Sequence, residues 1–374
     1  MKKIGIICEY NPLHNGHVHH FMEAKKESGT DLVILSLSGA FCQRGDLSIL
    51  DKFTKTKLAL EMGVDLVIEN PVIFSLEEAN RFAYYHVLNL VRAKVDEIWI
   101  GSEEADETLF AKYLEVIESV AFKECQASFL KEGFSLKLSF VKALEKFPVP
   151  AIKSNDMLGI FYLKALRDLN SNILLKTIKR KSSNYQENTF NTTTFQSATA
   201  IRANISQAND FVPSYTLNAL KTAFNEDMLL PLVKYQIILN QDLNNLLEAS
   251  EGIENRLKLI LNDTTFTDAI STLATKRYSN AKLKRLLINV LFHITKDTYN
   301  NSMFEYDFLR VLGFNKVGQS YLKELKKKIK IYTNIKEGIN SIFDLELKIS
   351  KILDLIYHTD LLMLEQSGPL TNNS

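Results

Sequence analysis

A short apolar run followed by a turn with two histidines is the feature that most constrains the fold of this chain. Residues 4–7 are apolar and predict a β-strand, and residues 17–26 follow a helical pattern. Between them stands the sequence Cys8-Glu9-Tyr10-Asn11-Pro12-Leu13-His14-Asn15-Gly16-His17. The first amides of a helix have no internal partner and attract anions, so a strand, a tight turn and a helix start predict a phosphate-binding site.

The two histidines of this turn can act on one ligand. His14 and His17 are three residues apart, and residues at that spacing share a helix face. Both imidazoles can therefore contact a single phosphate chain. Gly16 lies between them and lets the backbone approach that chain without an intervening side chain. The alternative is a capped helix with two surface histidines, and these four residues alone leave both interpretations open.

The N-terminal half alternates short β-rich runs with longer amphipathic stretches. The pattern predicts strands at residues 3–8, 32–37, 66–69, 97–100 and 173–178, with helices at residues 52–62, 76–91 and 157–169 between them. Such alternation is typical of βαβ units and a parallel sheet. Ligands of these sheets bind at the carboxyl ends of the strands, near the point where the strand order reverses. The histidine turn follows the first strand, where that rule requires it.

The strand pattern fades from residue 204 onwards. Helices are predicted at residues 217–224, 229–247, 253–261, 282–295 and 321–330. We therefore predict an α/β domain over residues 1–205, followed by an all-helical domain over residues 206–374. The longest loop expected in the first domain covers residues 181–196, which are rich in Ser, Asn and Thr.

Composition restricts the class of protein further. A chain of 374 residues is long enough for two domains, and its net charge of +1 means that any nucleic-acid site must be a local patch. Cys8, Cys42 and Cys125 never form a Cys-x-x-Cys pair, which argues against a zinc ribbon or a disulfide framework and for a reducing compartment. The first apolar run is too short for a signal peptide. No run of about 20 apolar residues exists, so we expect no membrane span and a cytoplasmic protein.

Polar segments follow other predicted strands. Gln43 and Arg44 lie between two glycines in residues 38–45, a loop that suits an anionic or carboxylate substrate, although an isolated match is more often a surface turn. Gly101 can let an adenine or ribose lie against the backbone, or it can be a plain turn glycine. Asn155 or Ser154 can cap the following helix, a structural role that is sufficient by itself.

Two further segments can hold phosphate. Residues 176–181 carry four basic side chains in six positions, which would face a polyphosphate if they lie on the same sheet edge. A solvated strand end is the competing view. Ser197-Ala198-Thr199-Ala200-Ile201-Arg202 begins another helix after the polar loop, and it offers a second anion cradle.

These motifs together resemble a known family. The His-x-Gly-His pattern with the Ser197 to Arg202 element is similar to the nucleotidyltransferase superfamily, which includes class I aminoacyl-tRNA synthetases. An ordered set of segments resembles the bacterial tRNA(Met) cytidine acetate ligase family: residues 9–12, 38–39, 43–45, 51–52, 63–69, 101–103, 154–155, 158–159, Arg180, 197–202, 276–279 with Lys282 and Arg285, and 312–315. The resemblance covers nearly the whole chain.

This resemblance implies a fold, an activity and a set of residues. The fold is a Rossmann-like nucleotidyltransferase domain that uses ATP and acetate, followed by a helical tRNA-binding domain. The activity makes N4-acetylcytidine at the wobble position of elongator tRNA(Met) through acetyl-adenylate. The partners are therefore elongator tRNA(Met) and acetate, with Mg²⁺ accompanying ATP, and we expect no acetyl-CoA, no protein-bound metal site, no DNA and no membrane.

The residues carried over fall into four groups. His14, His17 and Arg202 are the catalytic candidates. ATP would be bound by Ile7, Cys8, Glu9, Tyr10, Asn11, Pro12, Leu13, His14, Asn15, Gly16, His17, Val18, His19, His20, Gly101, Asn155, Arg180 and Ser197. Gln43 and Arg44 are the candidates for orienting acetate. The tRNA candidates are Lys276, Arg277, Tyr278, Lys282 and Arg285.

The tRNA candidates also stand out without the resemblance. Residues 276–285 hold five basic side chains and no acidic one, and Tyr278 lies among them, which suits phosphate contacts and base stacking. Lys55 and Lys282 stand where the family pattern leads us to expect Arg, which leaves the details of phosphate or RNA contacts open.

Three other functions are alternatives for a chain with these motifs. They are a small-molecule adenylyltransferase, an acetate ligase acting on a protein-bound thiol, and a catalytically silent RNA-binding protein. The basic stretch argues against the first two, and intact His14, His17 and Arg202 argue against the third.

Overall fold

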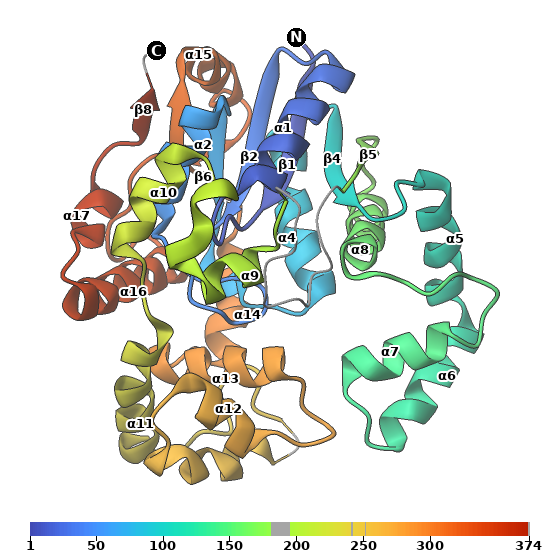
Figure 1. The fold of residues 1–374 in the computed structure, drawn as a ribbon, viewed down its shortest axis with the longest axis vertical. Helices are drawn as coiled ribbons and strands as arrows, with labels where there is room; N and C mark the ends of the chain where they lie inside the picture. The colour runs from blue at the N-terminus through green and yellow to red at the C-terminus, as the bar shows by residue number, and fades with distance from the viewer. Residues whose placement is uncertain (181–194, 241, 251, 373–374) are drawn as a thin grey trace.

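The computed structural model describes residues 1–180, 195–240, 242–250 and 252–372 (Figure 1). Most of the loop predicted at residues 181–196 lies outside these ranges. Within them the strand order is β5-β4-β1-β2-β3-β6-β7, and β8 pairs with β6. Neighbouring strands from β5 to β3 are all parallel. The first five strands are β1 (Lys3–Cys8), β2 (Leu32–Ser38), β3 (Leu66–Asn70), β4 (Glu97–Ser102) and β5 (Leu174–Lys179).

Hydrophobic cores form on both faces of this sheet, as expected for parallel strands that carry helices on each side. Ile4 and Ile6 of β1 join the core with α1 (Asn15–Ser28) and α2 (Lys52–Met62). The other face packs against α4 (Ala79–Arg92), where a Cβ on Gly5 would lie only 2.7 Å from Leu90. That contact explains the glycine within β1. The short helix α3 (Val72–Ser75) precedes α4.

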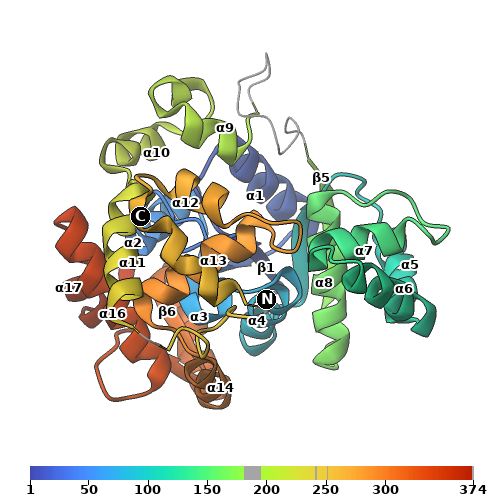
Figure 2. The same ribbon diagram turned by 90° about the horizontal axis from the view of Figure 1, so that it is seen from below.

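A helical hairpin extends from the α4 side of the sheet. The helices α5 (Glu107–Glu118), α6 (Val120–Lys131) and α7 (Leu136–Leu144) follow β4 in the chain and precede α8 (Ser154–Asp168). Figures 1 and 2 show them on the far side of α8 from β1. Phe122 of α6 meets Phe140 of α7 at 5.3 Å between ring centroids, and Phe140 meets Phe161 of α8 at 5.8 Å. This aromatic row fixes the hairpin against α8.

The second half of the chain begins as a set of short helices. These are α9 (Ala198–Ala203), α10 (Ser214–Ala219), α11 (Leu230–Leu239), α12 (Phe266–Leu273), α13 (Asn280–Phe292) and α14 (Lys296–Glu305), with 3-10 turns at Ile205–Asp210, Leu220–Thr222, Glu226–Leu229 and Ile253–Asn262. Figure 1 shows α11, α12 and α13 beyond the carboxyl ends of the parallel strands, on the side opposite both chain termini. This region therefore covers the edge of the sheet where ligands bind.

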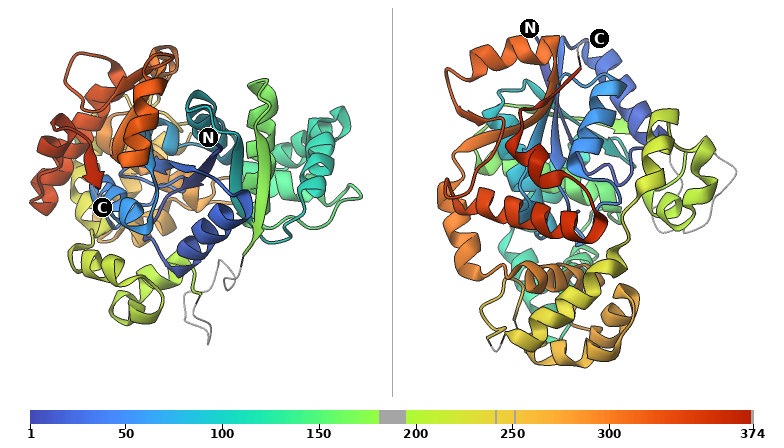
Figure 3. Two further views of the ribbon diagram at one scale, coloured as in Figure 1. Left: turned by 90° about the horizontal axis from the view of Figure 1, so that it is seen from above. Right: turned by 90° about the vertical axis from the view of Figure 1, so that its left-hand side faces the viewer.

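The chain then returns to the sheet. The last elements are β6 (Phe308–Asn315), α15 (Lys316–Leu325), β7 (Lys330–Tyr332), α16 (Ser341–Tyr357), α17 (Leu361–Gln366) and β8 (Leu370–Asn372). Strand β6 runs antiparallel to β3, and α16 and α17 lie beside the sheet (Figure 3). The predicted fold class, a mostly parallel α/β sheet with a helical region after it, is confirmed. The prediction that residues 206–374 are helical throughout is wrong for β6, β7 and β8, and the boundary near residue 206 stays a prediction.

A buried charge cluster joins this returning segment to the first strands. Lys52 Nζ lies 2.6 Å from Glu69, 2.9 Å from Glu346 and 2.5 Å from Glu365, and Arg310 contacts Glu365 at 3.2 Å. All five side chains are at most 5% exposed. Removing one partner of such a network leaves an uncompensated buried charge, so the cluster ties the C-terminal helices to α2 and β3.

Candidate active site

The predicted phosphate-binding turn lies where the strand order reverses. The chain goes from β1 to β2 on one side, whereas β4 and β5 lie on the other side of β1. A cleft of about 1230 Å³ opens at the carboxyl ends of β1, β4 and β5. Small-molecule sites commonly measure roughly 300 to 1,000 Å³, so this cleft has room for more than a nucleotide.

The histidine turn caps its own helix. His14 is the N-cap of α1, and its Nδ1 accepts the Gly16 N–H at 3.0 Å. Nδ1 of His17 accepts the His14 N–H at 3.3 Å, which completes a reciprocal capping box. The two rings stack with centroids 3.8 Å apart. A Cβ on Gly16 would lie 2.8 Å from Cε1 of His14, so the glycine is required by this ring position.

These bonds assign the protonation of both rings. Because each Nδ1 accepts a backbone hydrogen, the proton of each neutral imidazole sits on Nε2. Burial, followed by the charges of Arg180 and Arg202, lowers the pKa of His14 to about 3. Burial and the neighbouring His14 lower the pKa of His17 well below its ordinary value. Both rings line the cleft as neutral groups with an Nε2–H to donate.

Two arginines lie beside the histidines. Arg180 follows β5, where its backbone N–H donates to Ser102 O at 2.9 Å. A Cβ on Gly101 would lie 3.3 Å from the Arg180 side chain, so the glycine leaves room for the arginine, and it also lines the cleft. Arg202 of α9 donates to Asn11 O at 2.7 Å, which ties α9 to the histidine turn. Ser197, the N-cap of α9, accepts the Ala200 N–H at 3.1 Å.

The opposite wall is built at the start of α8. We expected Ser154 or Asn155 to cap this helix, but Lys153 is the N-cap residue and makes no side-chain cap. Glu103, just after β4, accepts the Asp156 N–H at 3.1 Å and the Asn155 side-chain amide at 2.5 Å. A carboxylate from another strand end thus replaces the local cap, and it holds Asn155 in the cleft wall.

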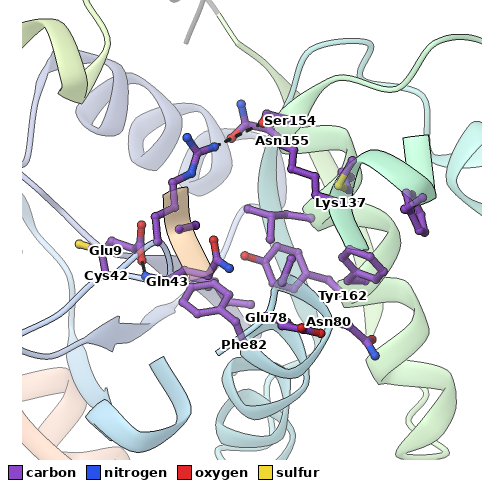
Figure 4. Close-up of a pocket in the computed structure, with 18 of the residues that line it drawn as sticks. Glu9, Cys42, Gln43, Glu78, Asn80, Phe82, Lys137, Ser154, Asn155 and Tyr162 are labelled. Carbon is purple, nitrogen blue, oxygen red and sulfur yellow. Dashed lines mark hydrogen bonds between the residues drawn. The ribbon is translucent and has the colours of Figure 1, made fainter. Parts of the chain in front are cut away.

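The loop after β2 forms a third wall. Glu9 Oε1 accepts the Gln43 N–H at 2.6 Å, and the Gln43 amide donates to Glu77 O at 2.9 Å. Arg44 spans to Ser154 Oγ at 3.4 Å. Figure 4 shows Glu9 and Gln43 on the wall opposite Tyr162. Gln43 and Arg44 therefore lie in the same cleft as the histidines, as the acetate hypothesis requires.

Lys55, for which the sequence left a contact with phosphate or RNA open, has a structural role. Its Nζ donates to Ser38 O at 2.8 Å, Gly39 O at 2.7 Å and Glu9 O at 3.0 Å. The side chain is fully buried. Lys55 thus fastens the loop after β2 to the histidine turn through backbone carbonyls, and it does not line the cleft.

The basic stretch divides into exposed and buried members. Arg277 and Lys282 line the cleft, and the exposed Lys276 lies beside it, with Nζ 3.9 Å from the centroid of the Phe134 ring. Tyr278 is 7% exposed and packs in the core, so base stacking does not suit it. Arg285 is also buried, contacting Glu248 at 2.5 Å and Gln43 O at 3.4 Å. Tyr278 therefore has a packing role, whereas Arg285 lines the cleft and is held there by Glu248.

The predicted ATP-binding segment is likewise mixed. Its members that line the cleft are Ile7, Cys8, Glu9, Tyr10, Asn11, His14, Gly16, His17, His19 and His20. The others hold the turn: Leu13 is fully buried, Val18 packs against the core, and Asn15 donates to Asp210 O at 2.9 Å. Pro12 follows a cis peptide bond and does not line the cleft.

The sequence interpretation missed the part of the cleft formed by α6, α7 and the Tyr162 side of α8. Lys137, Phe134 and Tyr162 line the cleft, and none of them belongs to a motif that was recognised. Residues 120–146 contain several lysines that could have indicated a ligand-binding surface, but glutamates between them make the segment resemble an ordinary solvent-exposed helix pair. Among the described residues, no three His, Cys, Asp or Glu side chains group as a metal site, and no helix is long and apolar enough to cross a membrane.

Comparisons with known proteins agree with this geometry. Residues 1–366 match the family described as HIGH Nucleotidyl Transferase. A tRNA(Met) cytidine acetate ligase of Clostridium perfringens is 37% identical and covers 95% of this chain and 96% of its own length. One from Caldanaerobacter subterraneus is 36% identical, with 88% of each protein covered.

Solved structures show the same similarity. The crystal structure of Thermotoga maritima TmcAL superposes with a TM-score of 0.88 at 26% identity, covering all of both chains. A form of that protein bound with alpha-thio ATP gives a TM-score of 0.86. The similarity at this extent confirms the resemblance inferred from the motifs, and the chain belongs to the tRNA(Met) cytidine acetate ligase family of HIGH nucleotidyltransferases.

Proposed function

We propose that this protein is an ATP-dependent tRNA(Met) cytidine acetate ligase. It activates acetate as acetyl-adenylate and transfers the acetyl group to N4 of the wobble cytidine of elongator tRNA(Met). The observation that carries this proposal is the shared cleft: the neutral His14 and His17, the guanidinium of Arg202, and the cations Arg277 and Lys282 all line it. Adenylation groups and an RNA-facing surface therefore meet in one space.

The first step is attack of an acetate oxygen on the α-phosphorus of ATP, with pyrophosphate leaving. Negative charge builds on the phosphate oxygens, and the Nε2–H groups of His14 and His17 are placed to donate to them. Neutral donors in a buried site are preorganised, so they stabilise this charge without reorganisation. Arg180 and Arg202 supply the positive charge for the polyphosphate, and Mg²⁺ accompanies ATP as its usual partner. Gly101 and Asn155 would face the nucleoside.

In the second step the cytidine N4 attacks the acetyl carbonyl and AMP leaves. This exocyclic amine is a poor nucleophile, so the acyl group must be activated before transfer. An anticodon base is single-stranded, which lowers the cost of moving it into a cleft. Gln43 and Arg44 lie between the histidines and α8, where they can orient acetate and then the acyl group.

The same proposal predicts which molecules are not used. The ATP-type turn requires no acetyl-CoA, DNA or membrane, and a cytoplasmic location supplies ATP, acetate and tRNA together. The three alternatives remain a small-molecule adenylyltransferase, an acetate ligase acting on a protein-bound thiol, and a silent RNA-binding protein.

ATP–pyrophosphate exchange tests the activation step. We expect exchange that depends on acetate and that occurs without tRNA. Exchange with other acids but not with acetate would favour a different adenylyltransferase. No exchange with any acid, together with tRNA binding, would favour the silent RNA-binding protein. Acetyl transfer to a carrier-protein thiol but not to tRNA would favour the thiol ligase.

A further inference from the structure

The α6–α7 hairpin forms a wall of the cleft that no motif assigned. It consists of α6, α7 and the turn between them, and it faces the start of the basic stretch across the cleft mouth. Lys276 Nζ lies 3.9 Å from the Phe134 ring centroid, and a Cβ on Gly133 would lie 3.6 Å from Arg277 Nε. The two segments are more than a hundred residues apart in sequence, yet their side chains touch.

Cations converge on one aromatic ring at this contact. Lys142 Nζ lies 5.0 Å from the Phe134 centroid on the hairpin side, whereas Lys276 approaches the ring from the basic stretch. Phe134 itself is partly exposed and lines the cleft. An aromatic face that binds an ammonium group also suits a flat base, so a base that stacks on Phe134 would take the place of Lys276 on the ring.

This wall carries several basic side chains, and one acidic residue at the end of the preceding helix α5, Glu118, also lines the cleft. Lys123, Lys131 and Lys137 of the hairpin line the cleft. Within the part of the chain that the structure describes, none of them forms an ion pair with a carboxylate, and neither do Lys142, Lys276, Arg277 or Lys282. Lys137 faces the cleft from the side opposite Glu9 and Gln43 (Figure 4). Partial burial, followed by the charge of Arg44, lowers the pKa of Lys137.

Solvated charge runs are the ordinary explanation for surface lysines, but this group differs in two ways. Lys123, Lys131 and Lys137 line a cleft instead of an outer face. Lys142 and Lys276 lie over the ring of Phe134, which lines the same cleft. Phosphates need the cations and unstacked bases need the ring, so the combination fits single-stranded RNA better than duplex RNA, whose bases are stacked.

We propose that the α6–α7 hairpin is a second RNA-binding wall, which holds the single-stranded anticodon nucleotides of the substrate tRNA against residues 276–282. Phe134 stacks on a base, and Lys131 and Lys137 contact phosphates. This inference rests on the proposed function, because it identifies where that function's RNA substrate lies. The strand would then run along the cleft past this contact and reach the histidine turn.

Variants of the full-length protein test this wall. We expect Phe134→Ala to weaken binding of elongator tRNA(Met) by roughly 5- to 150-fold, the cost of losing one base stack, and Phe134→Trp to restore it. The double variant Lys131→Ala with Lys137→Ala should weaken binding and lower the logarithmic salt slope by roughly 0.7 for each phosphate that is no longer neutralised. Fluorescence anisotropy with labelled tRNA over a salt series measures both, and circular dichroism checks folding.

The matched control removes two lysines that are near but outside the cleft. Lys112 of α5 and Lys146 just after α7 are exposed, and neither lines the cleft. The double variant Lys112→Ala with Lys146→Ala should bind tRNA with the parent's affinity and salt slope. An isolated anticodon stem-loop should show the same ranking of variants as whole tRNA, since the hairpin is proposed to bind the loop.

Three outcomes would overturn the inference. The first is parent-like tRNA binding by folded Phe134→Ala and by the lysine pair. The second is an equal loss in the control pair, which would mean a general charge effect. The third is displacement of tRNA by polyglutamate but not by a single-stranded RNA, which would assign the wall to an acidic protein partner. Absence of acetate-dependent exchange in the parent would instead refute the proposed function. The tRNA-binding measurements would still decide whether the hairpin binds RNA.

Discussion

Substitution of His17 separates its capping role from its catalytic role. In the structure Nδ1 accepts the His14 N–H, and Nε2 is left to donate into the cleft. His17→Ala removes both functions. His17→Asn keeps an acceptor near the Nδ1 position but loses the donor, whereas His17→Gln places an N–H near the Nε2 position. The three variants therefore test one atom at a time.

The structure sets the size of each effect. Loss of a helix cap costs about 0.5 to 2 kcal/mol, and the 3.3 Å length of the His14–His17 bond places this cap near the lower end. Loss of one preorganised donor to a developing oxyanion costs about 100- to 1000-fold in rate. We expect His17→Ala to lose a few degrees at most in melting temperature but about two to three orders of magnitude in exchange.

The assay is acetate-dependent ATP–pyrophosphate exchange beside a thermal melt. His17→Asn should match His17→Ala in exchange while melting closer to the parent, and His17→Gln should retain more exchange than either. Near-normal exchange by folded His17→Ala would show that the ring is a capping group only. Equal losses in His17→Gln and His17→Asn would refute the assignment of Nε2 as the donor.

Three further predictions concern neighbouring residues. Gly16→Ala should abolish most of the ATP–pyrophosphate exchange, because its Cβ would displace the His14 ring. Exchange at the parent rate in this variant would show that the observed position of the His14 ring is not needed for activity. Arg285→Ala should destabilise the protein by up to about 3 to 5 kcal/mol in denaturant unfolding, because Glu248, whose side chain is only 10% exposed, then loses its partner. Arg285→Ala with Glu248→Gln should recover part of the loss, and a single-variant loss below about 1 kcal/mol would show that the ion pair contributes little to stability. The free energy of unfolding should fall as the pH drops from about 6.5 towards about 3, because His14 and His20 bind protons in the unfolded chain but stay neutral in the folded state, where their pKa values are about 3 and about 4. His14→Asn should flatten this dependence. A free energy of unfolding that rises on acidification would show that the rings are charged in the folded protein.

The local parts of the fold were predictable from sequence. The predicted bounds of β1 and α2 agree with the structure. The spacing of apolar residues within one segment is enough to identify a buried strand or an amphipathic helix. The histidine turn was predictable for the same reason, since its cap, glycine and rings are neighbours in the chain.

Long-range features were not predictable in this way. Strand β6 pairs with β3, from which it is separated by more than two hundred residues in the chain. The residues 308–315 themselves do not indicate which edge of the sheet the strand joins. The cap of α8 comes from Glu103, and Tyr278 lies in the core although its neighbours are basic. The hairpin wall depends on Phe134 meeting Lys276, a contact that only the packing of α6 and α7 against α8 creates.

The most direct test of the central claim is acetylation of elongator tRNA(Met) by the purified protein. The reaction contains an unmodified transcript, ATP, Mg²⁺ and isotope-labelled acetate, and nucleosides are analysed by mass spectrometry after digestion. We predict labelled N4-acetylcytidine at the wobble position only when ATP and acetate are both present, with AMP formed in equal amount. Acetylation from acetyl-CoA without ATP, or acetate-dependent exchange that never yields acetylated tRNA, would contradict it.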